Sequence, residues 1–397
     1  MPRILRIINR LNIGGPTYNA VFLTKYLAPE YETCLLSGQI FAGEASSSFV
    51  AAENGVEPRF IRSLERTPNP FNDFLAYREI RQIIKEFKPD IVHTHATKPG
   101  LVGRLAAYHE KVPVIIHTYH GHYFHSYFHP IITKFFLFIE RWLATKSTGI
   151  IAISESQKKE LADVYHVADS DKIHVVHNGF DLSKFTDNQE FKRKSFRQQW
   201  SISNNEIAIG IIGRIVPIKN HPLFLSACAT LKQLCPPNIK LRFFIIGDGT
   251  DKDAVEAQAK HLGFTLGSQQ QPAELTFTSW IRDIDIATAG LDIIVLSSLN
   301  EGTPVSLIEA QAAAKPIVTT RVGGVADIVI PNQTAFVTPS RDANAMANAL
   351  LQLIKNPDQR IQMGNEGRKY VMERFSYQTL VQNMRSCYEQ LFKKAGS

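Results

Sequence analysis

The sequence has 397 residues, is 44% hydrophobic and carries a formal net charge of +7. This length exceeds what one hydrophobic core usually supports, so we expect two domains. Because the chain has no dense basic block and no apolar run of membrane-spanning length, it predicts neither a nucleic-acid partner nor a transmembrane helix. Four cysteines without zinc-like spacing, and an N-terminus without a signal-peptide core, predict reduced thiols in a cytoplasmic protein.

The first half of the chain alternates apolar runs with amphipathic segments. A strand at 3–9, a turn containing Gly14 and Gly15, and a helix at 18–27 predict the first unit of a doubly wound parallel sheet. The turn lacks the full GxGxxG pattern of a nicotinamide site. Its glycines either let a ligand approach the backbone or form a plain tight turn. Further strands are expected at 33–37, 91–95, 114–119, 149–154 and 172–177, and further helices at 72–87, at 101–108 and from Glu155.

Histidines gather where two of these strands end. His95 closes one strand and His120 follows the next, and ligands of such sheets lie at the carboxyl ends of the strands. A zinc site is disfavoured, because strand alternation puts His117 and His120 on opposite faces and no HExxH pattern occurs. One histidine poised at the ligand is the preferred interpretation, because neutral imidazole both donates and accepts hydrogen bonds.

The segment from Tyr123 to Trp142 is strongly aromatic, with Lys134 and Arg141 interspersed. One interpretation is a hydrophobic acceptor groove or a helix on a membrane surface. The alternative is a helix that packs into the core.

The second half restarts the pattern after a polar interdomain segment at 181–203. A buried strand at 207–212 leads into a loop with Gly213, Arg214 and Lys219, and a helix follows from His221 or Pro222. Two cations beside the free N–H groups of a helix N-terminus suit a diphosphate, although solvated loop cations are the alternative. Strands are expected at 241–246 and 274–278, and Asp283-Ile284-Asp285 is interpreted as a helix cap rather than a metal motif.

The stretch from Ser297 to Gly324 follows another buried strand at 293–296. It places Glu301 on a loop, Pro304 in the first turn of a helix and Glu309 inside that helix. This arrangement suits an anionic, hydroxyl-rich ligand, whereas the alternative is a surface helix with two solvated glutamates. A strand at 316–319 and helices at 342–354, 357–374 and 376–394 complete the prediction.

These motifs together resemble the retaining glycosyltransferase family 4, which has the GT-B fold. The strongest part of the resemblance is the E-x7-E signature, here Glu301 and Glu309, followed by Gly323-Gly324. The other matching pieces are Gly14-Gly15, HTHATKPG at 93–100, HGH at 120–122, AISES at 152–156, HNGFD at 177–181 and GRIVPIKN at 213–220.

The resemblance implies a role for each matching residue. Glu309 would hold the ribose hydroxyls of the nucleotide, and Arg214 and Lys219 would neutralise the diphosphate. His120 would reach a sugar hydroxyl near the reacting carbon. The donor sugar would lie against Glu301 and the adjoining residues Gly302, Thr303, Pro304 and Val305. The remaining expected donor contacts are Gly14 and Gly15 at the phosphate or acceptor, Gly213 in the phosphate loop, and Ile281 beside the base.

The implied fold class is α/β, with two Rossmann-like doubly wound parallel-sheet domains facing across a cleft. We expect an acceptor-side domain at 1–190, a nucleotide-sugar domain at 191–375 and a C-terminal helix at 376–397 that returns to the first domain. The expected activity is retaining and metal-independent transfer of a hexose or N-acetylhexosamine from a UDP-sugar to a lipid-linked or saccharide acceptor in glycan or polysaccharide assembly. The stretch 123–142 would contact the inner face of the membrane. The alternatives are a UDP-sugar 2-epimerase on the same scaffold and a binding module without catalysis.

Overall fold

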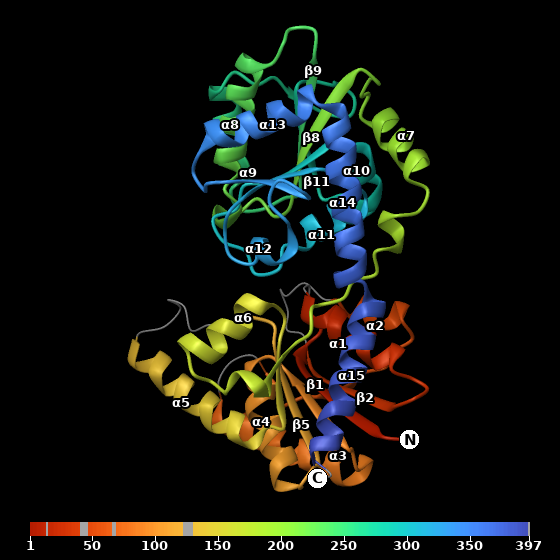
Figure 1. Cartoon of the computed structure of the whole chain (residues 1–397), viewed down its shortest axis with the longest axis vertical. Coiled ribbons are helices and arrows are strands. Elements are labelled where there is room, and N and C mark those ends of the chain that lie inside the picture. The colour runs from red at the N-terminus through yellow and green to blue at the C-terminus, as the bar shows by residue number, and fades with distance from the viewer. Residues whose placement is uncertain (13–14, 40–46, 66–68, 122–129, 396–397) are drawn as a thin grey trace. The chain divides into compact units, whose positions relative to one another are not determined.

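The structure is a computed structural model of the whole chain, and it describes residues 1–12, 15–39, 47–65, 69–121 and 130–395 (Figure 1). The chain separates into two compact units, Met1–Phe180 with Arg374–Ser397, and Asp181–Glu373. The first boundary lies before the expected residue 190, because the short 3-10 helix Ser183–Phe185 contacts α10 and α11 of the second unit. The C-terminal helix belongs to the first unit, with which it was expected to associate.

Within the described residues, the first unit holds a seven-stranded parallel sheet in the order β3-β2-β1-β4-β5-β6-β7. Its strands are short and mostly apolar, as expected for strands buried on both faces by helices. The bounds are β1 Arg3–Arg10, β2 Glu32–Gly38, β3 Arg59–Ile61, β4 Ile91–His95, β5 Val114–Tyr119, β6 Gly149–Ala152 and β7 Ile173–Val175.

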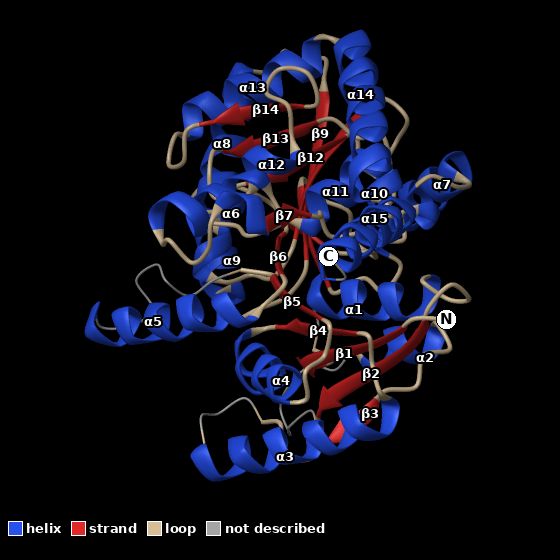
Figure 2. Cartoon of the chain, turned by 60° about the horizontal axis from the view of Figure 1, so that its bottom comes forward, coloured by secondary structure: helices blue, strands red, loops and turns tan. Residues whose placement is uncertain are grey.

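Helices cover both faces of this sheet, and α3 and α4 pack against each other along it (Figure 2). The first helix begins at Gly15, earlier than expected. The next long helix begins at Pro70 rather than Asn72, because the side chain of Asn69 accepts hydrogen bonds from Phe71 N and Asn72 N. The bounds are α1 Gly15–Tyr26, α2 Ser48–Glu53, α3 Pro70–Phe87, α4 Thr97–His109, α5 Pro130–Lys146, α6 Glu155–Lys159 continued by a π-helical turn Glu160–Val164, and a 3-10 turn Ser170–Lys172.

The C-terminal helix α15, Tyr377–Ala395, is a structural part of the first unit. Its buried residues Leu380, Met384 and Leu391 share one hydrophobic cluster with Ile4 of β1 and Ile91 of β4. Gly149 leaves room for this packing, since a Cβ atom there would lie 2.8 Å from Leu391 Cδ1. The first sheet therefore buries one face with the last residues of the chain.

The second unit repeats the architecture with the order β10-β11-β9-β8-β12-β13-β14 among its described strands. Its core clusters apolar residues of β8, β9 and β12 with the helices α8 and α13. The strands are β8 Glu206–Ile212, β9 Lys240–Ile246, β10 Leu266–Gly267, β11 Leu275–Ser279, β12 Ile293–Leu296, β13 Ile317–Thr320 and β14 Ala335–Thr338. The helices are α7 Gln189–Gln199, α8 His221–Leu234, α9 Lys252–His261, α10 Ile284–Gly290, α11 Val305–Ala312, α12 Val325–Ile328, α13 Ala343–Lys355 and α14 Pro357–Phe375, with a 3-10 turn Pro217–Lys219.

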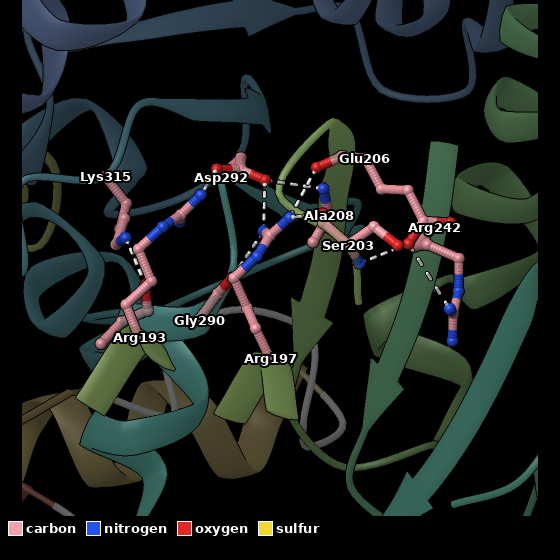
Figure 3. A network of polar contacts seen from close by, with 10 residues as sticks. Arg193, Arg197, Ser203, Glu206, Ala208, Arg242, Gly290, Asp292 and Lys315 are labelled. Atoms are coloured by element: carbon pink, nitrogen blue, oxygen red, sulfur yellow. Dashed lines mark hydrogen bonds and ion pairs between the residues drawn. The ribbon is translucent and has the colours of Figure 1, made fainter. Parts of the chain in front are cut away.

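A polar network ties α7 to the amino ends of β8 and β12 (Figure 3). Asp292 binds Arg193 at 2.6 Å and Arg197 at 3.1 Å, and it accepts the backbone N–H of Ala208 at 2.8 Å. Burial by itself would raise the pKa of Asp292, but Arg193, the Ala208 N–H and Arg197 outweigh it and lower that pKa. Arg197 is only 4% exposed and also donates to the carbonyl oxygens of Ser203 and Glu206. The network therefore fixes α7 at the edge of the sheet opposite the strand ends that carry the site residues.

We expect Asp292→Asn to lower the free energy of unfolding of the second unit by about 3 kcal/mol, because Arg197 would stay buried without its carboxylate. Urea unfolding followed by circular dichroism measures the change. The control is Glu190→Gln, which removes an i,i+4 ion pair to Lys194 whose two side chains are almost fully exposed. Equal midpoints for Asp292→Asn and the control would contradict the role given to Asp292.

Candidate active site

Loops that follow five strands of the second sheet meet at its carboxyl edge. Backbone hydrogen bonds join the loop after β8 to the loop after β9, from Ile215 N to Asp248 O, and to the loop after β12, from Leu299 N to Ile218 O. Ser279 at the end of β11 donates to Asp248, and Gly324 after β13 donates to the carbonyl oxygen of Glu301. The sequence stretches 213–220 and 297–324 thus form one continuous structure, as their positions after parallel strands predicted.

Gly323 and Gly324 seat the Glu301 loop by close backbone contact. A Cβ atom on Gly324 would lie 1.7 Å from the carbonyl oxygen of Gly302, and one on Gly323 would lie 2.0 Å from that of Glu301. Gly323 also has a φ of +43°, which favours glycine. The double glycine is therefore required by the loop that carries Glu301, whatever ligand that loop holds.

Lys219 and Glu301 form a partly buried ion pair. Lys219 Nζ lies 2.5 Å from Glu301 Oε1, and Ser298 Oγ donates to the same oxygen at 2.6 Å. The backbone of the Lys219 loop is held as well, since Ser297 Oγ donates to the carbonyl oxygens of Lys219 and Asn220. The sequence named both charged residues but not this pairing, because they are 82 residues apart.

The rest of the β8 loop presents cationic and backbone groups. Arg214 is exposed, and the side chain of Lys219 passes over Gly213, whose hypothetical Cβ would lie 3.8 Å from Lys219 Cε. Any added side chain at Gly213 would therefore meet the lysine stem. The structure brings Gly213, Lys219 and Glu301 together, with Arg214 on the same loop.

Glu309 lies in α11, a little over one turn after its start at Val305. Pro304 is the residue before the helix rather than part of its first turn, and Gly302 and Thr303 form the loop that leads to it. Burial raises the pKa of Glu309 to about 7, with Lys184 opposing and Asp285 reinforcing the shift. This carboxyl group therefore changes charge near neutral pH.

Ile281 lies in the loop after β11, between Trp280, which is 60% exposed, and Arg282. Gly247 N donates to the carbonyl oxygen of Ser279, which ties the start of this loop to the end of β9. The cap expected from Asp283 is wrong in detail, because Asp283 stands at the N-cap of α10 but its side chain makes no capping hydrogen bond. The loop after β11 thus joins the same edge as Lys219 and Glu301.

In the first unit, His120 follows β5 and contacts a second histidine. Its Nε2 atom lies 2.9 Å from His95 Nδ1, and the two rings stack with centroids 5.2 Å apart. Burial lowers the pKa of His120 to about 4, partly opposed by Asn178. Burial also lowers the pKa of His95 well below its usual value, so both rings are neutral at pH 7.

The glycine turn after β1 is described only in part. Gly14 lies outside the described residues, and Gly15 is the first residue of α1, where a Cβ atom would lie 3.3 Å from Asn178 Nδ2. Asn178 also accepts a hydrogen bond from Asn19 of α1. Asn178 is therefore a polar neighbour of both Gly15 and His120. The sequence had marked it only as a turn residue.

A cavity of about 250 Å³ opens beside His120. It is lined by residues from the end of β4, the start of α4 and the end of β5, namely Ala96, Thr97, His117, Thr118, Tyr119, His120 and Gly121. His117 is held at its edge by a 2.9 Å hydrogen bond to Thr94. His117 and His120 thus have different partners, as the strand alternation predicted, and no group of three His, Cys, Asp or Glu side chains in the described chain is arranged to hold a metal ion.

Residues 123–129 of the aromatic stretch lie outside the described residues, and its remainder forms the first part of α5. Several large apolar side chains of α5 face solvent, namely Ile131, Ile132, Phe135, Phe138 and Trp142. These side chains show that α5 is not simply a core helix. Among the described residues, no helix is long and apolar enough to cross a membrane.

Comparison with known proteins agrees with both halves of the chain. Residues 24–184 match the family described as Glycosyltransferase Family 4, and residues 192–370 match Glycosyl transferases group 1. The chain is 27% identical over 306 residues, 76% of either chain, to the UDP-Gal:alpha-D-GlcNAc-diphosphoundecaprenol alpha-1,3-galactosyltransferase of Escherichia coli. It is also 27% identical to the capsular polysaccharide biosynthesis glycosyltransferase CapM of Staphylococcus aureus, over 82% of this chain and 83% of that one.

Solved structures confirm the expected fold. The structure of Anabaena Alr3699/HepE in complex with UDP superposes with a TM-score of 0.80 at 18% identity, covering 98% of this chain and 100% of that one. A UDP-GlcNAc 2-epimerase from Neisseria meningitidis shares the fold more distantly, with a TM-score of 0.66 at 14% identity over 97% of this chain and 100% of the epimerase. The fold alone does not separate transferases from epimerases, but the sequence matches do, and the chain belongs to glycosyltransferase family 4 and is a glycosyltransferase of the GT-B fold.

Proposed function

We propose that the protein transfers a hexose or an N-acetylhexosamine from a UDP-sugar to a lipid-linked or saccharide acceptor in glycan or polysaccharide assembly. The observation that carries the proposal is the edge of the second sheet, where Lys219, Glu301 and the start of α11 come together. The names of the E. coli and S. aureus relatives, which specify a UDP-galactose donor with a diphosphoundecaprenol acceptor and capsular polysaccharide, support the substrate classes.

The donor-binding roles follow from the chemistry of this edge. Departure of a nucleoside diphosphate builds negative charge on a phosphate oxygen, and Arg214, Lys219 and the backbone around Gly213 offer preorganised positive groups for it. Glu309, when ionised, accepts hydrogen bonds from the two ribose hydroxyls. The transferred sugar lies against Glu301 and the segment from Gly302 to Val305, and Ile281 flanks the base.

In this proposal His120 meets a hydroxyl of the transferred sugar, and Gly14 and Gly15 meet the donor phosphate or the acceptor. A neutral His120 suits this task, because it donates from one ring nitrogen and accepts at the other. Transfer proceeds with retention of the anomeric configuration, as the family resemblance implies, and without a metal ion, because the cations supply the charge that a metal would. The 2-epimerase alternative is disfavoured by the transferase relatives.

A donor screen tests the proposal. UDP-sugars should raise the melting temperature of the protein, whereas GDP-sugars and ADP-sugars should not, because ligand binding stabilises the folded state by mass action. The best donor is then incubated with a diphosphoundecaprenol-linked sugar, with and without EDTA. We expect an unchanged rate with EDTA and the anomeric configuration of the donor in the product, read by NMR. Formation of an epimerised UDP-sugar without acceptor would instead establish the epimerase.

We further propose that α5 holds the first unit against the cytoplasmic face of a membrane, where a lipid-linked acceptor is available. The single acidic residue of α5, Glu140, points inward and is only 3% exposed, since Arg104 NH2 and Tyr119 Oη both bind its Oε2 atom. The exposed side of α5 therefore combines apolar side chains with Lys134 and Arg141 and carries no acid. This combination favours adsorption to anionic lipid.

The double substitution Phe135→Ser and Phe138→Ser should weaken binding to vesicles of phosphatidylglycerol at least tenfold, since each side chain loses its burial in the lipid interface. Vesicle sedimentation measures the affinity. Phe191→Ser with Ile361→Ser is the matched control, because both side chains are more than 60% exposed but lie in the second unit. Equal loss of affinity in the two double variants would contradict the role of α5.

A further inference from the structure

A buried chain of hydrogen bonds connects the C-terminal helix to the strands that carry the histidines. Arg6 of β1 and Tyr388 of α15 are both fully buried, and Arg6 NH2 lies 3.1 Å from Tyr388 Oη. Tyr388 Oη lies 2.6 Å from His93 Nδ1, and His93 Nε2 lies 2.7 Å from Thr118 Oγ1 of β5. Four elements that are distant in the sequence thus share one polar path.

The direction of these hydrogen bonds follows from Arg6, which donates but never accepts. Since Tyr388 Oη accepts from Arg6, its own hydrogen is free to be donated to His93 Nδ1. A neutral His93 then carries its hydrogen on Nε2 and donates it to Thr118 Oγ1. The opposite assignment would leave the buried hydroxyl hydrogen of Tyr388 without an acceptor among the described residues, which is costly.

Ring packing carries this order on to His120. The His93 and His95 rings lie on one side of β4 with centroids 4.3 Å apart, and His95 in turn stacks on and hydrogen-bonds His120. His95 Nε2 and His120 Nδ1 are buried and have no partner among the described residues, so packing and the single mutual hydrogen bond hold these two rings. A rotation of His93 would therefore pass directly to His95 and His120.

The charge around these rings favours neutral forms. Arg6 has no carboxylate partner among the ion pairs of the described chain and donates to Thr24 and Tyr388. Burial first, and then Arg6 and His120, lower the pKa of His93 well below its usual value. With His93 uncharged, its tautomer is set by Tyr388 rather than by protonation at both nitrogens.

We propose that Tyr388 is a positioning residue of the active site, which acts through His93 and His95 to hold the ring of His120 in one orientation and one hydrogen-bonding state. The C-terminal helix then contributes to catalysis as well as to the core of the first unit. This inference rests on the proposed role of His120 in sugar transfer, but its structural part does not depend on the identity of the substrate.

The test is Tyr388→Phe, which removes one oxygen and keeps the ring in the core. In protein labelled with ¹⁵N-histidine, NMR should show His93 as the Nε2–H tautomer in the wild type and as a mixture in the variant, with altered His95 and His120 ring signals. We expect kcat for sugar transfer to fall about tenfold, the size of one hydrogen bond, while KM for the donor stays constant. A purely structural role would lower the melting temperature without moving the ring signals.

Tyr31→Phe is the matched control, because Tyr31 is also buried and packs edge-on against Tyr388, 6.0 Å between centroids. Unchanged His120 signals in Tyr388→Phe, or equal losses of kcat in the two variants, would overturn the proposal. If Tyr388→Phe does not fold, Arg6→Met provides the test, since it frees the Tyr388 hydroxyl and should also mix the His93 tautomers. A wild-type protein without transferase activity would contradict the proposed function, whereas the ring signals would still decide whether Tyr388 holds His120.

Discussion

Replacing Lys219 with methionine is expected to lower kcat for sugar transfer by about 10²–10³-fold. Methionine keeps the length and apolar stem of lysine but removes the charge that would stabilise the departing diphosphate. The fold should survive, because the Lys219 loop is also held by Ser297 Oγ and by the Leu299 N–H. Loss of the cation should also free Glu301, whose remaining hydrogen bond comes from Ser298.

The measurement is steady-state transfer with the donor identified by the thermal-shift screen. Lys232→Met is the matched control, since Lys232 also forms a partly buried ion pair, with Glu274 at 2.7 Å, but lies on α8 and outside the strand-end loops. A Lys219→Met enzyme with a kcat within threefold of the wild type, at equal melting temperature, would refute the role of Lys219 at the diphosphate.

Glu309→Gln is expected to weaken UDP-sugar binding on the order of 10²-fold, because two hydrogen bonds from ribose hydroxyls to a charged acceptor would be lost or reduced to neutral ones. Isothermal titration calorimetry at pH 8 measures the change. The amide keeps the size of the side chain, so a large loss would report on charge rather than on packing. Equal affinities for the variant and the wild type would place the ribose elsewhere.

The wild-type affinity itself should depend on pH. Because the pKa of Glu309 is raised to about 7 and the ligand requires the ionised form, binding should be about tenfold tighter at pH 8 than at pH 6. A UDP-sugar is the right probe, since its diphosphate is esterified at both ends and does not titrate in this window. Asp285→Asn should move the midpoint to lower pH and Lys184→Met to higher pH, because Asp285 raises and Lys184 lowers the pKa of Glu309.

The same pKa shift has an opposite signature in the unliganded protein. A carboxyl group whose pKa is higher in the folded than in the unfolded state binds more protons when folded between pH 4.5 and about pH 7. Its contribution to stability is therefore present at low pH and is lost as the pH rises through this window. Glu309→Gln should remove that slope, and a slope that persists in the variant would assign the titration to another group.

Much of the fold was predictable from local sequence. Apolar runs such as Ile293–Leu296 predicted buried parallel strands, and the restart of the pattern near Ile207 predicted a second sheet. Helix starts were less certain, because a cap such as Asn69 acts through a side-chain hydrogen bond that periodicity does not reveal. Very short edge strands such as Leu266–Gly267 were missed, since two residues carry no alternation that could be recognised.

The candidate site was predictable only as a set of separate residues. The rule that ligands lie at the carboxyl ends of parallel strands selected His120, Glu301 and the loop with Lys219. It gave no sign that Lys219 and Glu301 pair, or that Gly324 must approach Gly302 closely, because both contacts depend on how neighbouring strands are ordered in the sheet.

By itself the sequence determined the α/β class, the two similar halves and the family, because these depend on periodicity and on short motifs that are local in the chain. Only the tertiary structure decided the chemical states of the residues. Burial raises the pKa of Glu309 and lowers that of His120, and Tyr388 reaches His93 across 295 residues of chain. Desolvation and long-range hydrogen bonds depend on the surroundings of a side chain in the folded protein, and these surroundings are set by packing rather than by neighbouring letters.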